Sequence, residues 1–240
     1  MDTTLRMIRA AAELGTTTIV CTPHLYNMDP DLVERVRRVH AEVVAAVEEA
    51  RIPIRLLSGF EVDQSVALTS DPDTLSTLCV QNPDGAGHVL IMETPFSGWP
   101  PLIEQNIRRL AGLGILPVLA HPERNDRVQR SPDILADCLD AGVVLQGTSG
   151  SFSPMFRRDS HKTFYELLAR GWFGLLASDG HSDPEYTWSL GPLLAELGDR
   201  ITAEERDLLV SVNPARVLEG KQPIPIMPKR SSGKGWRRLL

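Results

Sequence analysis

The stretch Leu116-Pro-Val-Leu-Ala-His-Pro-Glu-Arg124 combines a continuous apolar run with an abrupt polar end. Continuous apolar runs of this length are typical of parallel strands that helices cover on both faces. A helix is predicted before it, over Leu102–Leu113, and Gly114 lies between the two, where a left-handed helix cap is expected. The stretch therefore predicts a strand of a parallel α/β fold with polar residues at its carboxyl end.

The same helix-to-strand unit recurs on both sides of this stretch. The predicted strands are Thr17–Cys21, Ile54–Leu57, Val89–Met92, Leu116–Ala120, Val143–Gln146 and Gly174–Ala177. The predicted helices are Thr4–Leu14, Asp31–Ala50, Leu102–Leu113, Pro132–Ala141, Ser160–Arg170, Pro192–Leu197 and Ala203–Val210. The segment Ser70–Gly87 is expected to be irregular because it is rich in Asp, Pro and Gly.

The order of these elements predicts the architecture. Strands that alternate with helices in one direction favour an α/β barrel or a strongly wound sheet. The chain opens on a helix, so the strand that would come before the first unit is expected to be missing. A barrel that lacks one strand leaves two strand edges unpaired.

Composition places the chain among soluble globular proteins. Its 240 residues, 42% of them hydrophobic, suffice for one large domain with its own core, which we assign to residues 1–220. The net charge of −6 predicts neither a nucleic-acid partner nor membrane insertion. Residues 221–240 are predicted to form a flexible basic tail, because Pro228–Leu240 is rich in Lys, Arg, Ser and Gly and contains no acid.

The cysteines and the amino terminus indicate a compartment. Cys21, Cys79 and Cys138 are scattered without C-x-x-C spacing, and we interpret them as small buried hydrophobic residues in a reducing compartment. No apolar run reaches membrane-spanning length, and the amino terminus lacks a signal-peptide core. A cytoplasmic protein is therefore predicted, and the sequence leaves its oligomeric state open.

The chemistry-bearing residues share one kind of position, the carboxyl ends of the predicted strands. They occur in Cys21-Thr-Pro-His24, Gly59-Phe-Glu61, Met92-Glu93-Thr-Pro95, His121-Pro-Glu-Arg124 and Ser178-Asp179-Gly-His181. In α/β barrels the functional face is built from these ends and the loops that follow them. One polar strand end means little, but five of the six predicted strands end in His, Asp or Glu. This convergence predicts one shared site.

The residue types predict a metal site that acts on phosphate. Histidine nitrogen mixed with carboxylate oxygen, without cysteine, suits ions such as Mn, Fe or Zn. A carboxylate can bridge two ions, so a multinuclear site is expected; such ions activate water and stabilise charge on phosphoryl oxygens. Arg124 offers a planar fork suited to bidentate phosphate binding. The combination favours hydrolysis of a phosphate ester over other metal chemistry.

Three neighbours of these strand ends have simpler interpretations. Glu123 is expected to support the Arg124 loop rather than to bind metal. Phe96 and Trp99 follow Glu93 in the chain and are candidates for stacking on an aromatic substrate. Ordinary packing of these two rings is the slightly favoured alternative.

Competing catalytic motifs are poorly supported by the sequence. A cysteine phosphatase needs Arg six positions after its cysteine, and Asn27, Gly85 and Val144 occupy those positions here. The turn Gly147-Thr-Ser-Gly150 is not a G-x-S-x-G nucleophile elbow, because its second glycine comes one residue early. No G-x-x-x-x-G-K-[ST] phosphate loop occurs.

The five strand-end motifs, in this order, resemble those of the polymerase-and-histidinol-phosphatase (PHP) superfamily. Within it, the chain looks most like the bacterial tyrosine-protein phosphatases of capsular and exopolysaccharide clusters. The likeness runs from about Asp2 to Asn213-Pro-Ala-Arg216. Its most specific part is His121-Pro-Glu-Arg124 followed by Ser131-Pro-Asp-Ile-Leu.

The resemblance implies an architecture, a cofactor and a substrate. The fold would be a distorted (β/α)7 barrel that holds up to three divalent ions, commonly manganese. The reaction would remove phosphate from tyrosines of a partner kinase of capsule or exopolysaccharide biosynthesis. The implied metal ligands are His24, Glu61, Glu93, His121, Asp179 and His181. Among the catalytic residues, His121 and Asp179 would act with Arg124, which would bind the phosphate.

The sequence also departs from this family. Relatives begin with a strand that ends in a His-x-His pair, which this sequence lacks, so two ligands and the first strand are expected to be missing. Leu25 stands where relatives often have a second histidine. Either Met1 is an internal start, which we favour because the other ligands are intact, or the chain is a catalytically impaired binding module. Weak or no activity, poor stability and fewer ions are therefore expected, and histidinol phosphate is the alternative substrate.

Overall fold

The computed structural model describes residues 1–84, 87–152, 158–181 and 190–228. It is a parallel α/β fold, in which every ladder between named strands is parallel. The strands are β1 (Thr18–Cys21), β2 (His24–Leu25), β3 (Arg55–Ser58), β4 (Glu61–Val62), β5 (His88–Met92), β6 (Ile115–Ala120), β7 (Val144–Thr148) and β8 (Phe173–Ala177). They lie side by side in chain order, β1 beside β3 and then β2-β4-β5-β6-β7-β8.

Two short breaks divide the first two strands without disturbing their register. β1 pairs with β3 through Cys21 opposite Ser58, and β2 pairs with β4 through His24 opposite Glu61, at the same offset. The breaks are bridged by backbone hydrogen bonds from Gly59 N–H to Cys21 O (2.9 Å) and from Glu61 N–H to Pro23 O (3.1 Å). The described strands therefore form one continuous, sequentially ordered arrangement of six strands. No ladder in the described part of the chain joins β8 back to β1 or β2, so closure of a barrel is not seen.

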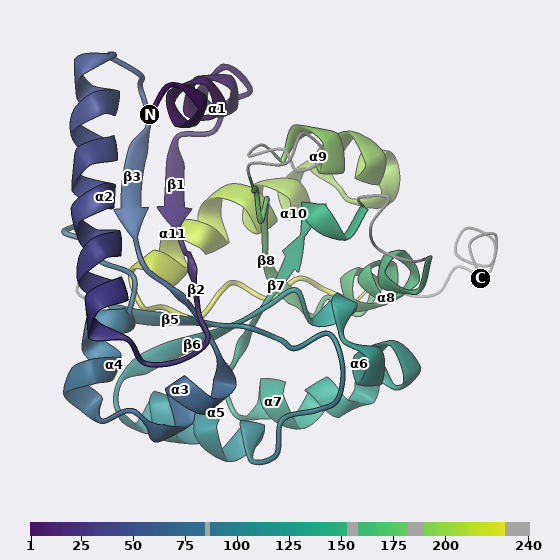
Figure 1. The fold of residues 1–240 in the computed structure, drawn as a ribbon. Coiled ribbons are helices and arrows are strands. Elements are labelled where there is room, and N and C mark those ends of the chain that lie inside the picture. The colour runs from purple at the N-terminus through teal and green to yellow at the C-terminus, as the bar shows by residue number, and fades with distance from the viewer. Residues whose placement is uncertain (85–86, 153–157, 182–189, 229–240) are drawn as a thin grey trace.

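Helices follow the strands and cover the sheet. They are α1 (Asp2–Glu13), α2 (Pro30–Glu49), α3 (Gln64–Thr69), α4 (Pro72–Leu78), α5 (Ile103–Gly112), α6 (Asp126–Arg130), α7 (Ala136–Asp140), α8 (Arg158–Ala169), α9 (Gly191–Leu197), α10 (Ala203–Asp207) and α11 (Asn213–Leu218). In Figure 1, α2 runs along β3 and β1, while α3, α5 and α7 gather below β5 and β6. None of the helices in the described residues combines the length and apolar character that a bilayer crossing requires.

The core follows the hydrophobic pattern of the sequence. Every residue of β6 is buried, as its continuous apolar run predicts, and Leu119 packs in the main cluster with Ile107 and Phe164. A separate small cluster, formed by Ile8, Val47 and Ile52, joins α1 to α2. All four residues of β1 are only half-buried, because β1 pairs on one side alone within the described residues.

The structure corrects the prediction for the segment Ser70–Gly87. That segment contains the helix α4, and α3 comes directly before it, so it is not irregular throughout. The Asp71 side chain accepts a hydrogen bond from Thr74 N–H, and Pro72 occupies the first turn of α4. An Asp-Pro pair that caps a helix in this way is a readable start signal. The Asp, Pro and Gly content alone indicates only turns.

Other boundaries shift by small amounts. The predicted helix Pro132–Ala141 divides into a 3-10 turn, Pro132–Leu135, followed by α7. The predicted left-handed caps at Gly114, Gly142 and Gly171 are confirmed by φ values of 74°, 98° and 68°. All three cysteines are free thiols, with Cys79 and Cys138 buried.

The first residues of the predicted tail lie against the domain. Asn213, fully buried, donates from its amide nitrogen to Ile224 O (3.0 Å) and Gly174 O (2.9 Å), and its oxygen accepts from Ile224 N–H (2.8 Å). Ile226 packs in the main core cluster with 6% exposure. The first part of the predicted tail is thus bound to the domain, and residues 229–240 lie outside the described residues.

Candidate metal centre

The predicted ligands lie at the carboxyl ends of the parallel strands. His24 and Glu61 are the first residues of β2 and β4, the short continuations of β1 and β3, and they are register partners. Glu93 comes directly after β5, and its N–H donates to Val62 O (2.9 Å), which continues the ladder. His121 follows β6 and Asp179 follows β8. Because parallel strands point the same way, these residues share one edge of the sheet.

Three of these residues form a group with the composition of a metal site. One donor atom each from His24, Glu61 and Glu93 lies within 4.8 Å of the other two. His24 Nδ1 is 3.5 Å from Glu93 Oε2, and both atoms are shielded from solvent without a hydrogen-bond partner in the described structure. Leaving buried polar atoms unsatisfied is costly, and a shared cation would satisfy both. The donor set therefore fits a divalent metal ion.

His121 joins this group through Glu61. Its Nε2 lies 2.8 Å from Glu61 Oε1, and both side chains are buried. The backbone of His121 is left-handed, with a φ of 37°. Non-glycine residues in this conformation are uncommon and cluster at functional sites.

Asp179 and His181 complete the predicted set from the end of β8. His181 Nε2 is 3.5 Å from Asp179 Oδ1, and the His181 ring stacks at 6.2 Å from the ring of His24. Asp179 also has a left-handed backbone, with a φ of 51°. The six predicted ligands therefore form one connected set. His121 contacts Glu61, and His181 connects Asp179 to His24.

The carboxylates favour positive charge at this edge. The pKa of His24 is raised mainly by its contact with Glu93, against an opposing effect of burial, and the charges of Glu61 and Asp179 raise it further. A site that stabilises a proton on histidine also stabilises a cation in the proton's place, and the two compete.

Arg124 is held beside the ligands by buried side chains. Its NH1 contacts Asp179 Oδ2 at 2.6 Å, and its Nε donates to Ser151 Oγ at 3.1 Å. Ser151 Oγ in turn donates to Glu123 Oε1 (2.6 Å), which also accepts from Thr148 N–H (3.1 Å). Glu123 thus supports the Arg124 loop, as predicted. Burial raises the pKa of Glu123, while Arg124 and the Ser151 hydrogen bond act in the opposite direction.

The two predicted substrate residues differ in their surroundings. Phe96 is 55% exposed, and its ring stacks 6.2 Å from that of His121. Trp99 is partly buried and packs against the main core cluster, with its Nε1 shielded from solvent. The Asn125 amide nitrogen donates to Pro95 O and Gly98 O, both at 2.7 Å, and holds the loop between them. Phe96 is therefore the more accessible of the two rings.

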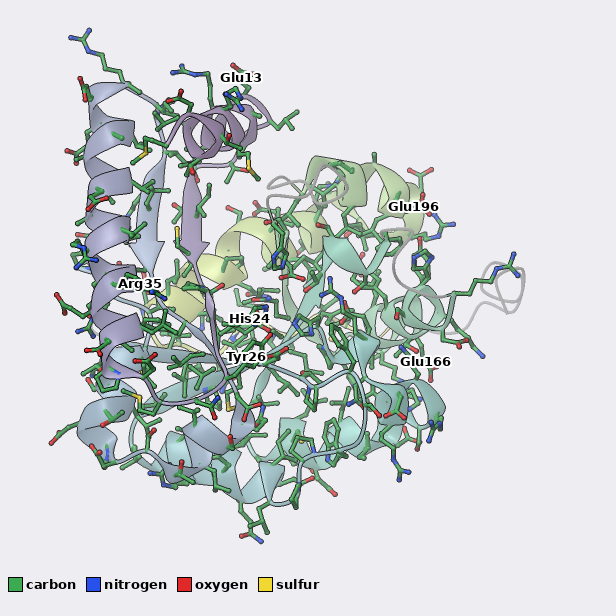
Figure 2. All side chains as sticks on the ribbon, in the orientation of Figure 1. Glu13, His24, Tyr26, Arg35, Glu166 and Glu196 are labelled. Carbon is green, nitrogen blue, oxygen red and sulfur yellow. The ribbon has the colours of Figure 1, made fainter. Side chains whose placement is uncertain are left out.

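Sequence reasoning missed two sets of residues near the centre. Tyr26, 54% exposed, stacks on His24 at 5.1 Å, and Figure 2 shows the two side by side, far from Glu13. Its position two residues after a ligand was the available signal. The last residue of β7, Thr148, and Ser151 in the turn after it also lie near the centre, although this strand end carries no histidine or carboxylate.

A cluster of histidine and carboxylate donors beside a buried arginine, at the strand ends of a parallel α/β fold, is typical of metal-dependent phosphoesterases. The sequence model of the family "Capsular polysaccharide synthesis, CpsB/CapC" matches residues 1–219. The chain belongs to the CpsB/CapC family.

Individual relatives agree with this assignment. Tyrosine-protein phosphatase YwqE of Bacillus subtilis is 28% identical over 182 residues, which cover 74% of this chain and 69% of YwqE. CapC of Staphylococcus aureus is 24% identical over 182 residues, with the same shares of the two chains.

A solved structure supports the fold. It belongs to a set of crystal structures of YwqE from Bacillus subtilis and CpsB from Streptococcus pneumoniae, described as metal-dependent tyrosine phosphatases. It superposes with a TM-score of 0.78 at 24% identity, over 95% of this chain and 91% of that one. The α/β fold expected from the sequence is thereby confirmed.

Proposed function

We propose that this chain is a metal-dependent protein-tyrosine phosphatase that acts on a tyrosine kinase of capsule or exopolysaccharide biosynthesis, in the cytoplasm. The observation that carries the proposal is the donor group of His24, Glu61 and Glu93 beside the buried Arg124. Membership of the CpsB/CapC family and the phosphatase names of its relatives support the reaction and its setting.

The metal would be held by the residues of the strand ends. The proposed ligands are His24, Glu61, Glu93, His121, Asp179 and His181. Mixed nitrogen and oxygen donors without sulfur suit manganese. Bound divalent ions supply Lewis-acid stabilisation of phosphoryl charge and an activated water.

His121 and Glu61 lie in direct contact within this site. Their atoms Nε2 and Oε1 are 2.8 Å apart, close enough to share one proton.

Arg124 binds and orients the phosphoryl group. Its guanidinium is a fixed cation with a planar fork that matches two phosphoryl oxygens. Because the side chain is only 4% exposed, its attraction for a dianion is weakly screened by water. Its contact with Asp179 keeps it next to the proposed ligands.

Phe96 provides the proposed contact for the aromatic ring of phosphotyrosine. Its ring is exposed and lies beside His121, where the leaving group of an aryl phosphate would extend from the centre. Aromatic pairs contribute roughly 0.5–1.5 kcal/mol beyond burial, enough to favour aryl over alkyl phosphates.

The test is hydrolysis of a phosphotyrosine peptide by the purified chain with Mn²⁺, compared with histidinol phosphate. The expected result is turnover of the peptide that chelation abolishes and that Arg124→Lys lowers at least tenfold. The sequence contains no His-x-His pair, so the rate is expected to be low and long incubations are needed. Preferred turnover of histidinol phosphate, or phosphopeptide turnover unaffected by chelation, would overturn the proposal.

A further inference from the structure

Three successive strand ends meet at Arg124. Arg124 follows β6, Ser151 lies in the 3-10 turn Ser149–Phe152 after β7, and Asp179 follows β8. Two contacts orient the guanidinium group: Nε donates to Ser151 Oγ (3.1 Å), and NH1 contacts Asp179 Oδ2 (2.6 Å). The arginine is thus held in one orientation by residues from both sides.

The hydroxyl of Ser151 is the link between Arg124 and a buried carboxylate. Ser151 and Glu123 are both 0% exposed, and Ser151 Oγ lies 2.6 Å from Glu123 Oε1. A carboxylate only accepts hydrogen bonds and an arginine Nε only donates them, whereas a hydroxyl does both. The Ser151 proton therefore points to Glu123, and its lone pair faces Arg124.

The anchor of this chain of hydrogen bonds is itself fixed. Glu123 Oε1 also accepts from Thr148 N–H at 3.1 Å, at the end of β7. The turn that carries Ser151 is tied to the next strand end, because Ser149 Oγ donates to Ser178 O at 2.8 Å. Rotation of Ser151 away from Arg124 would break a bond to the buried Glu123.

We propose that Ser151 is a positioning residue that sets the orientation of the Arg124 guanidinium, with Glu123 as its anchor. The proposal rests on the proposed function, in which Arg124 binds the phosphoryl group. It also gives a role to the β7 end, the strand end at which the sequence offers no metal ligand. A preorganised donor is effective because it need not reorient when charge develops on the phosphoryl oxygens.

The experiment compares Ser151→Ala with Ser151→Thr, which keeps the hydroxyl, in the full chain. Thr163→Val is the matched control, because Thr163 is also buried and its hydroxyl donates to Asp159 O (2.8 Å) within α8. The readouts are kcat and KM for p-nitrophenyl phosphate with Mn²⁺, the affinity for inorganic phosphate, the bound manganese and Tm.

Ser151→Ala is expected to lower kcat/KM about 10- to 100-fold, through both kcat and KM, and to weaken phosphate binding about tenfold. The amount of manganese bound by Ser151→Ala is expected to equal that of the original chain. Ser151→Thr should restore most of the lost activity and phosphate affinity, and Thr163→Val should change only Tm. Should Ser151→Ala not fold, Ser151→Cys, a weak donor of similar size, is judged by the same criteria.

Two outcomes would overturn the proposal. The first is a Ser151→Ala protein with unchanged phosphate affinity and kcat/KM. The second is a loss of kcat/KM and phosphate affinity that Ser151→Thr does not restore and that is accompanied by less bound manganese or a lower Tm. If the original chain hydrolyses no aryl phosphate, the proposed function fails, and the phosphate affinities of the variants still decide the role of Ser151.

Discussion

Arg124 and Asp179 form a buried ion pair, with NH1 and Oδ2 2.6 Å apart and side chains that are 4% and 11% exposed. The first residue is the proposed phosphate ligand and the second a proposed metal ligand. One carboxylate therefore faces both the arginine and the donor group. Removing one partner of such a pair leaves an uncompensated buried charge, which is costlier than the pair is favourable.

Asp179→Asn tests this shared role. The neutral amide removes the charge that pairs with Arg124 NH1, so the free energy of unfolding is expected to fall by about 3–5 kcal/mol in the absence of metal. Urea denaturation measures the fall, and manganese analysis should find less bound metal. Asp133→Asn is the control, since its pair with Arg170 is largely exposed and contributes about 1 kcal/mol or less. Equal stability of the two variants would contradict the role assigned to Asp179.

Manganese itself should stabilise the folded chain. A ligand that binds only the native state at 100 times its Kd adds about 2.7 kcal/mol, so Tm should rise with MnCl₂ concentration. Glu93→Gln should lose most of this rise, because an amide oxygen is a weaker, uncharged donor. Glu13→Gln, at the exposed end of α1 and distant from His24 in Figure 2, should keep it. A Tm that does not respond to manganese in any variant would refute the metal centre.

The sequence predicted what local patterns encode and missed what depends on distant contacts. The apolar run of β6 and the polar group that follows it lie within nine consecutive residues, so strand, burial and strand-end site could be read together. The Ser151–Arg124 bond joins residues 27 positions apart, and a serine in a turn has no distinctive pattern. The docking of Ile224 on Asn213 likewise depends on the tertiary fold.

Asn213→Ala should destabilise the domain substantially. Its side chain makes three part-buried hydrogen bonds to backbone groups of Gly174 and Ile224, and alanine removes all three. The expected loss in the free energy of unfolding is about 2–4 kcal/mol, measured in urea. In a chain ending at Gly220 the same substitution should cost less, because two of the three bonds are already absent. Equal costs in both backgrounds would argue against the docking of residues 221–226.

The thiols should react slowly in the native state. Burial raises the pKa of Cys21 to about 11 and those of Cys79 and Cys138 to about 12. Because the thiolate is the reactive species, the native chain at pH 8 should react with Ellman's reagent at least ~100-fold more slowly than the unfolded chain. The rate should rise as pH approaches 11. Cys21, the least buried of the three thiols, should react first. Rapid native labelling of all three would contradict this environment.

The Asn125 amide should matter for aryl substrates through the loop that carries Phe96. Asn125→Ala removes the bonds to Pro95 O and Gly98 O, so the Phe96 ring loses its fixed place beside His121. KM for p-nitrophenyl phosphate is expected to rise roughly tenfold, as in Phe96→Ala, because a misplaced contact forfeits its binding energy. Affinity for inorganic phosphate, which has no ring, should change less than twofold in both variants. A parallel loss of phosphate affinity would instead mean that the loop acts on Arg124 or the metal centre, and Phe96 would no longer be the contact for the ring.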